Sequence, residues 1–134
     1  KLLAEKKIIS NVRSNFSYFI ARIFSIYHKD QKKPFLYPSI KEKIKSNKKN
    51  EIFVENANSF RDFLEAEKVV NIIYKVYKKK ITGVYNIGSG KSMSIKKFIK
   101  KEINSRIKII SNDRINSLVS NNNKLNRKIN ANKI

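Results

Sequence analysis

The chain has 134 residues, no cysteine, one histidine (His28) and a formal net charge of +21. Without cysteine there can be no disulfide or thiolate metal site, and a single histidine forms no zinc-binding or catalytic cluster. No apolar run approaches the roughly 18 residues that span a membrane, and no signal peptide is evident, so a cytoplasmic protein is expected. The length allows one domain with a modest core. Because the sequence opens inside an expected helix and without Met, we expect a fragment.

The positive charge comes almost entirely from lysine. The chain contains 25 Lys against 6 Arg, together with 17 Asn and 21 Ile. This joint excess is typical of compositional drift, whereas a dedicated nucleic-acid interface would favour Arg, the better bidentate ligand for bases and phosphates. A solvated surface is therefore favoured. The alternative, a basic nucleic-acid-binding module, predicts a steep salt dependence of duplex binding.

The first half of the chain predicts two helices and two strands, from apolar residues at helical spacing and from short β-favouring runs. In chain order we expect a helix over 2–13, a buried strand over 18–23, a loop over 27–35, a helix starting at Pro38 with Ile40 and Ile44 buried, a solvated connection over 45–50, and a strand over 51–55.

The second half predicts strands alternating with helices, so the fold class is α/β. We expect an extended segment over 61–64, a helix over 65–79 that stops before Gly83, a strand over 84–87, a turn over 88–90, a helix capped by Ser94, a strand over 107–110, a weak helix over 122–129, and a frayed tail from Asn130. Acidic residues at the start of the 65–79 helix and Lys78 to Lys80 at its end complement the helix dipole.

Two features suggest an anion site. Arg61 offers a planar fork of donors beside a helix start, which suits a diphosphate, although it could instead pair with Asp62 on the surface. Gly88-Ser-Gly90 follows a strand but lacks the pattern of a phosphate loop or a dinucleotide fingerprint, so a structural turn is favoured. The acidic residues form no catalytic pair, because Glu65 and Glu67 are explained by the helix dipole.

Several segments resemble the extended short-chain dehydrogenase/reductase family, which comprises NAD-dependent nucleotide-sugar epimerases and dehydratases. The matching segments are Arg61-Asp-Phe-Leu-Glu-Ala-Glu-Lys-Val-Val70, Val84-Tyr-Asn-Ile-Gly-Ser-Gly90 with Ser94-Ile95, Ala21-Arg-Ile-Phe-Ser-Ile-Tyr27, and Asn121 to Leu125. They occur in the family's order along nearly the whole chain. The resemblance implies the C-terminal part of an NAD(P)-binding Rossmann-like enzyme together with its small substrate-binding lobe.

The resemblance also gives Lys1 a role. Lys1-Leu-Leu-Ala-Glu-Lys6 is similar to the end of the family's catalytic Tyr-x-x-x-Lys motif. Lys1 would then be the catalytic lysine, which holds the nicotinamide ribose and lowers the pKa of a tyrosine four residues upstream. NAD or NADP would be bound mainly by the missing N-terminal half, and the 134 residues alone would have no turnover.

Substrate-binding roles follow in the same way. Arg61 matches the arginine that binds the nucleotide-sugar diphosphate, Ser25 replaces a substrate-contacting Asn, and Leu36 precedes Pro38 where the family's substrate-loop residues lie. Ile52, Phe53 and Val54 match a strand near the nucleotide base. The chain also departs from the family pattern. The departures are His28 and Lys29 for Gly-Pro, Glu67-Lys68 for an acidic pair, and Ser111-Asn-Asp-Arg114 for Arg-x-Gly-Asp, which removes an expected phosphate-binding arginine.

The resemblance implies that residues 1–33 end the Rossmann-like core. Residues 34–134 would form mainly the substrate-binding lobe, with elements such as 66–87 returning to pack on the core. The expected function is substrate binding in an NAD(P)-dependent nucleotide-sugar epimerase, dehydratase or reductase, a homodimer at full length with no membrane or specific nucleic-acid partner. The alternative is a degenerate, non-catalytic member acting as a binding or scaffold protein, which the departures from the family pattern motivate.

Overall fold

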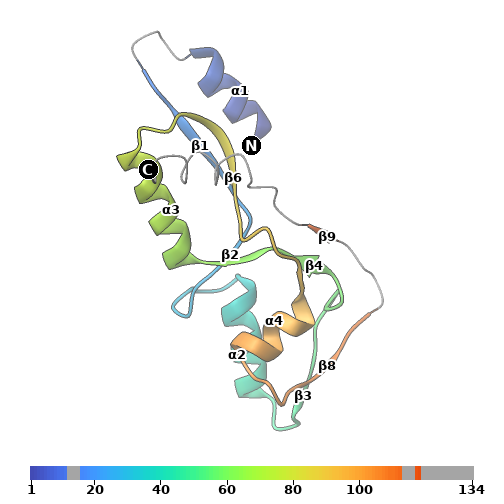
Figure 1. The fold of residues 1–134 in the computed structure, drawn as a ribbon. Coiled ribbons are helices and arrows are strands. Elements are labelled where there is room, and N and C mark those ends of the chain that lie inside the picture. Colours follow the sequence, from blue (N-terminus) through green and yellow to red (C-terminus); the bar gives the residue numbers. More distant parts are fainter. Residues whose placement is uncertain (12–15, 113–116, 119–134) are drawn as a thin grey trace.

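Figure 1 shows the computed structural model, which describes residues 1–11, 16–112 and 117–118. Its elements are α1 (Leu2–Asn11), β1 (Phe19–Ile23), β2 (Ser25–Tyr27), α2 (Leu36–Ser46), β3 (Glu51–Phe53), β4 (Phe60–Arg61), β5 (Phe63–Glu65), α3 (Ala66–Lys78), β6 (Gly83–Ile87), β7 (Met93–Ser94), α4 (Ile95–Glu102), β8 (Lys108–Ile110) and β9 (Ser117–Leu118). The predicted α/β class is confirmed. The helix expected over 122–129 and the tail from Asn130 lie outside the described residues.

The described residues form three two-stranded parallel sheets and one three-stranded sheet. β1 pairs with β6 from Phe19↔Gly83 to Ile23↔Ile87, β2 pairs with β5, and β3 pairs with β8. β4 lies between β7, which is antiparallel to it, and β9, which is parallel. Parallel strands cannot be joined by a tight turn, and α3 accordingly connects β5 and β6, which belong to two different parallel pairs.

Two apolar clusters form the core. The α3 cluster joins α3 to β5 and β6 and contains Leu64, Val69, Val76, Tyr85 and Ile87. The α4 cluster joins α2, β3, α4 and β8 and contains Ile40, Ile52, Val54, Ala57, Ile95, Phe98, Ile99, Ile107 and Ile109. Neighbouring side chains of a strand point to opposite faces. As a result β5 serves both clusters, with Leu64 in the α3 cluster and Phe63 packed against the α4 cluster.

Helices α3 and α4 confirm the sequence pattern. The helical spacing of Val69 and Val76 places both on the buried face of α3. The Ser94 hydroxyl accepts a hydrogen bond from the amide of Lys97 at 3.1 Å, so the predicted cap of α4 is present.

Two details of the sequence prediction are wrong. The strand at 18–23 is not buried, since Ile23 is 41% exposed and β6 is the only described strand that pairs with β1. α2 begins at Leu36, two residues before Pro38, because the first helical turn tolerates a residue without an N–H. The end of α3 before Gly83 is as predicted; Lys80, with a φ of 49°, follows the helix, and Gly83 begins β6.

Candidate functional site

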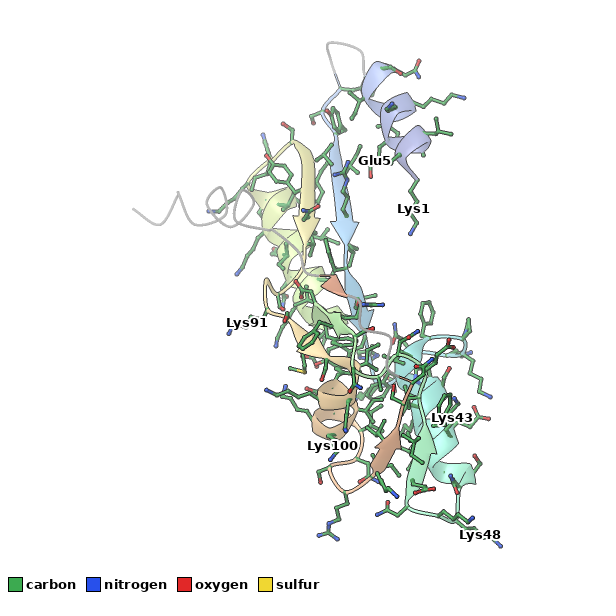
Figure 2. All side chains as sticks on the ribbon, turned by 90° about the vertical axis from the view of Figure 1, so that its right-hand side faces the viewer. Lys1, Glu5, Lys43, Lys48, Lys91 and Lys100 are labelled. Carbon is green, nitrogen blue, oxygen red and sulfur yellow. The ribbon has the colours of Figure 1, made fainter. Side chains whose placement is uncertain are left out.

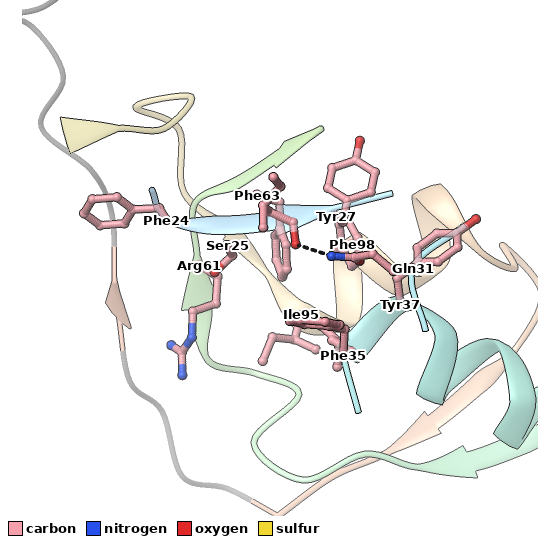
Figure 3. Close-up of a pocket in the computed structure, with 12 residues that line it drawn as sticks. Phe24, Ser25, Tyr27, Gln31, Phe35, Tyr37, Arg61, Phe63, Ile95 and Phe98 are labelled. Carbon is pink, nitrogen blue, oxygen red and sulfur yellow. Dashed lines mark hydrogen bonds between the residues drawn. The ribbon is translucent and has the colours of Figure 1, made fainter. Parts of the chain in front are cut away.

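Arg61 ends β4 and lines a cavity of about 400 Å³ (Figure 3). Its guanidinium Nη1 donates a hydrogen bond to the backbone oxygen of Phe60 at 2.8 Å. The residue is half-buried. An arginine in this position can bind a phosphate through two parallel hydrogen bonds.

Aromatic rings form one wall of this cavity. The rings of Phe63 and Phe98 stack with centroids 3.9 Å apart, and Tyr27 meets Phe98 edge-on at 4.9 Å. Tyr27 and Tyr37 extend the row, with centroids 6.2 Å apart. Because large rings packed in this way have little freedom, the wall is a rigid, mostly apolar surface.

The two ends of the cavity differ in charge. Arg61 brings a positive charge to one end (Figure 3). At the other end burial raises the pKa of the Tyr27 hydroxyl, and the nearby carboxylates of Glu102 and Glu65 raise it further. Arg61 therefore favours an anionic group at its own end of the cavity, whereas at the Tyr27 end the charge of Glu102 is partly offset by its ion pair with Lys101.

Three predicted substrate-binding residues line this one cavity: Ser25, Leu36 and Arg61. They come from β2, α2 and β4, which are distant in sequence. Ser25 is tied to the Arg61 segment directly, because its amide donates to the backbone oxygen of Asp62 at 3.1 Å. The roles of these residues stay predictions, but their convergence is a property of the fold.

The other predicted residues lie elsewhere. Ile52 and Val54 are buried in the α4 cluster, with exposures of 3% and 4%, and Phe53 is exposed outside the Arg61 cavity. Lys1 precedes α1, where its backbone oxygen accepts from the amide of Glu5 at 3.0 Å. The structure does not place these four side chains on the Arg61 cavity.

Sequence reasoning missed the part played by Asp62, which is fully buried. One carboxyl oxygen accepts from the Ser89 amide at 2.7 Å and from the Ser89 hydroxyl at 2.6 Å, and the other accepts from the Gly90 amide at 2.8 Å. Gly90 has a φ of 72°, a conformation that glycine adopts without strain. The prediction that residues 88–90 form a structural turn is confirmed, since these donors are directed at Asp62.

Aromatic residues of the cavity wall were also missed as site residues. Phe98 belongs to the α4 cluster, but its ring also lines the cavity together with Phe63. Helical spacing predicts that such a residue is buried, but it does not predict that the same side chain also lines a cavity. Phe63 pairs with Ser25 and Tyr27 pairs with Glu65, so the two rings lie at opposite ends of the neighbouring strands β2 and β5, and no local pattern predicts that they share a cavity.

Outside the Arg61 cavity, the described residues show neither a metal-ligand cluster nor a membrane-spanning helix, and their lysines are spread over several elements. Within residues 1–11, 16–112 and 117–118, no three His, Cys, Asp or Glu side chains gather as metal ligands. The same residues contain no helix long and apolar enough to cross a membrane. Figure 2 labels Lys1, Lys43, Lys48, Lys91 and Lys100, which project from separate parts of the ribbon. The lysine charge is thus distributed over several elements.

The sequence model of the family described as GDP-mannose 4,6 dehydratase matches residues 1–133. The chain therefore belongs to this family, within the extended short-chain dehydrogenases/reductases that the sequence motifs resemble. A search of the curated proteins gave no significant match.

Solved structures confirm the fold. TunA, an NAD-dependent NDP-hexosamine 5,6-dehydratase of tunicamycin biosynthesis, is 20% identical with a TM-score of 0.73, and the match covers 92% of this chain and 42% of TunA. RMD from Pseudomonas aeruginosa, solved with NADPH, is 20% identical with a TM-score of 0.80, covering 96% and 48%. UDP-glucose 4-epimerase from Thermotoga maritima, solved with UDP-glucose, is 19% identical with a TM-score of 0.71, covering 92% and 43%. This chain spans less than half of each.

Proposed function

We propose that this chain is the C-terminal, substrate-binding part of an NAD(P)-dependent nucleotide-sugar epimerase, dehydratase or reductase. The observation that carries the proposal is the meeting of Ser25, Leu36 and Arg61 in one cavity. The family resemblance assigns each of these residues to substrate binding on the basis of a different sequence segment. Family membership and the nucleotide-sugar ligands named for related structures support the same substrate class.

In this proposal Arg61 binds the diphosphate of the substrate. Its guanidinium matches two phosphate oxygens, and the half-buried position lowers the local dielectric and strengthens the attraction. The aromatic wall then packs against an uncharged part of the ligand, away from the carboxylates beside Tyr27. Ser25 contributes a short hydroxyl where the family has an Asn, so it would form fewer hydrogen bonds to the substrate.

The described residues do not form a dinucleotide site by themselves. Gly83 lies in β6, and the amides of Ser89 and Gly90 donate to Asp62, so this turn is not available to hold a pyrophosphate. We propose that NAD or NADP is bound mainly by an N-terminal half, with Lys1 as the catalytic lysine, and we assign no hydride-transfer step to the described residues. The division into 1–33 and 34–134, the homodimer and the cytoplasmic location stay predictions.

Binding of nucleotide sugars by the 134-residue chain tests the proposal. We expect calorimetric titration to detect GDP-mannose or UDP-glucose, and we expect Arg61→Ala to raise the Kd roughly 10- to 100-fold, the effect of losing hydrogen bonds to a charged group. Arg106→Ala is the matched control, because it removes one guanidinium from an exposed position outside the cavity. Its Kd should stay within about twofold of the wild-type value, since it makes no contact with the ligand.

The Arg106→Ala control distinguishes binding at a specific site from general attraction of the ligand by the net charge of +21. If Arg61→Ala and Arg106→Ala weaken binding equally, the affinity comes from charge alone and the assignment of Arg61 is wrong. If the wild-type chain binds neither nucleotide sugar, the proposed function is overturned. Binding without turnover in a full-length protein that carries the catalytic tyrosine would favour the non-catalytic scaffold.

A further inference from the structure

Asp62 is a fully buried acidic residue next to the arginine proposed to bind the diphosphate. Burying a carboxyl group costs free energy unless its oxygens are hydrogen-bonded. Both oxygens accept here, with three donors supplied by Ser89 and Gly90. Because the chain is extended at this point, successive side chains point to opposite faces. Asp62 therefore points toward the 88–90 turn while Arg61 points toward the cavity.

The Arg61 segment is fixed to residues 89–94 on both sides of Arg61. On one side Phe60 pairs with Ser94 and Arg61 pairs with Met93, in the antiparallel β4–β7 contact. On the other side the Asp62 carboxyl group binds Ser89 and Gly90. The backbone of Arg61 thus lies between two attachments to the same neighbouring segment.

A third attachment joins the Arg61 segment to β2, the strand that carries Ser25. The backbone oxygen of Asp62 accepts from the Ser25 amide, and Ser25 lines the cavity with Arg61. Asp62 therefore bonds in two directions, through its side chain to the 88–90 turn and through its backbone to β2. A change in its side chain would move the strand that carries Arg61 relative to the strand that carries Ser25.

We propose that Asp62 is a positioning residue, which holds the guanidinium of Arg61 at the cavity by anchoring its strand to Ser89 and Gly90. This inference rests on the proposed function of Arg61 in binding a diphosphate. A positioning role predicts that Asp62 affects ligand affinity through Arg61, whereas a purely structural role predicts a loss of stability without a specific link to Arg61.

The test is a double-mutant cycle of Asp62→Asn with Arg61→Ala, read as the Kd for whichever of GDP-mannose and UDP-glucose the wild-type chain binds. Asn keeps the shape of Asp but has only one oxygen acceptor, so its amide nitrogen must face a donor of Ser89 or Gly90. We expect Asp62→Asn to raise the Kd about tenfold when Arg61 is present and to leave it unchanged within about twofold when Arg61 is Ala.

Two further variants complete the experiment. Ser89→Ala removes one donor to Asp62 and keeps both backbone amides, so it is milder and should raise the Kd about twofold to threefold, again only when Arg61 is present. It replaces Asp62→Asn in the cycle if that variant does not fold. Val76→Ala, in the α3 cluster at 3% exposure, lowers the melting temperature without touching the turn and should leave the Kd unchanged.

The outcomes separate this inference from the proposed function. Wild-type binding that Arg61→Ala abolishes but Asp62→Asn does not change would overturn the positioning role alone. Equal losses from Asp62→Asn in both backgrounds, or an equal loss in Val76→Ala, would also overturn it, because the effect would then be general destabilisation. No binding by the wild-type chain, or no effect of Arg61→Ala, would overturn the function of Arg61 and this inference with it.

Discussion

The Arg61 segment contains one residue with a proposed role, and helix α1 directly follows another, Lys1, but the chain holds the two segments in different ways. The Arg61 segment has paired strands on both sides and a fully buried Asp62 with three accepted hydrogen bonds. α1 buries none of its residues, and Leu2 and Leu3 are 66% and 82% exposed. An ion pair between Glu5 and Arg22 links α1 to β1.

The two segments differ in whether contacts among the described residues are enough to fix the position of the residue with the proposed role. The geometry around Arg61 results from contacts within the chain, so binding by Arg61 is expected of the chain as it stands. The position of Lys1 depends on a ten-residue helix with no buried face, and isolated helices shorter than about 12–15 residues are marginal in water. The catalytic role proposed for Lys1 therefore requires contacts beyond those described.

The largest effect is expected from the packing beneath Arg61. Phe98 is 1% exposed and stacks on Phe63, so Phe98→Ala should lower the free energy of unfolding by about 3–5 kcal/mol, the sum of lost burial and a cavity. Urea unfolding measures this loss. Tyr77→Ala on α3, where the side chain is 75% exposed, is the control and should change stability by about 0.5 kcal/mol or less. A loss below about 1 kcal/mol for Phe98→Ala would show that the cavity wall is not a rigid part of the core.

The sequence predicted α3 and α4 well because both are defined locally, by apolar spacing and by caps such as Ser94. It predicted the burial of β1 wrongly. The burial of a strand depends on how many strands pair with it, and the apolar composition of the strand does not determine how many do. The start of α2 was misplaced by the assumption that Pro38 must be the first helical residue.

The candidate site was predictable to a different degree. The family motif singles out Arg61, but its meeting with Ser25 and Leu36 depends on the pairing of distant strands, which no local pattern shows. Asp62 was considered only as a surface partner of Arg61. Its burial follows from the alternation of side chains along the extended segment, once the position of the 88–90 turn is known. Ile52 and Val54 show the opposite case, since their apolar character is fully explained by the α4 cluster.

A smaller effect is expected at the end of α3, the helix that connects the Arg61 segment to β6. The amide of Ile81 donates to the backbone oxygen of Val76, and that of Lys80 donates to the backbone oxygen of Tyr77, which is a Schellman motif. Lys80 occupies its left-handed position with a φ of 49°. Lys80→Gly should therefore raise the free energy of unfolding by about 1 kcal/mol, because glycine adopts this conformation without a steric penalty.

The control for this stabilisation is the preceding residue. Lys79 has a φ of −92°, an ordinary conformation for any residue, so Lys79→Gly should leave stability unchanged or lower it. Thermal unfolding of the two variants in parallel measures the difference. Equal effects would mean that loss of a lysine charge, rather than relief of the left-handed conformation, changes stability.

The smallest effect is expected at α1 and depends on pH. Hydrogen bonding and attraction from Arg22 lower the pKa of Glu5, with atoms as close as 2.6 Å. A carboxyl group whose pKa is lower in the folded chain stabilises that state above its unfolded pKa, and the contribution is lost as the pH falls through the folded pKa. Because Arg22 is 47% exposed, solvent and salt weaken the pair, and the change in total stability should be small. NMR titration of the Glu5 carboxyl group should show a pKa below its usual range, and Arg22→Gln should bring it back. An identical titration in both chains would show that Arg22 does not hold Glu5, and α1 would then lack even this link to β1.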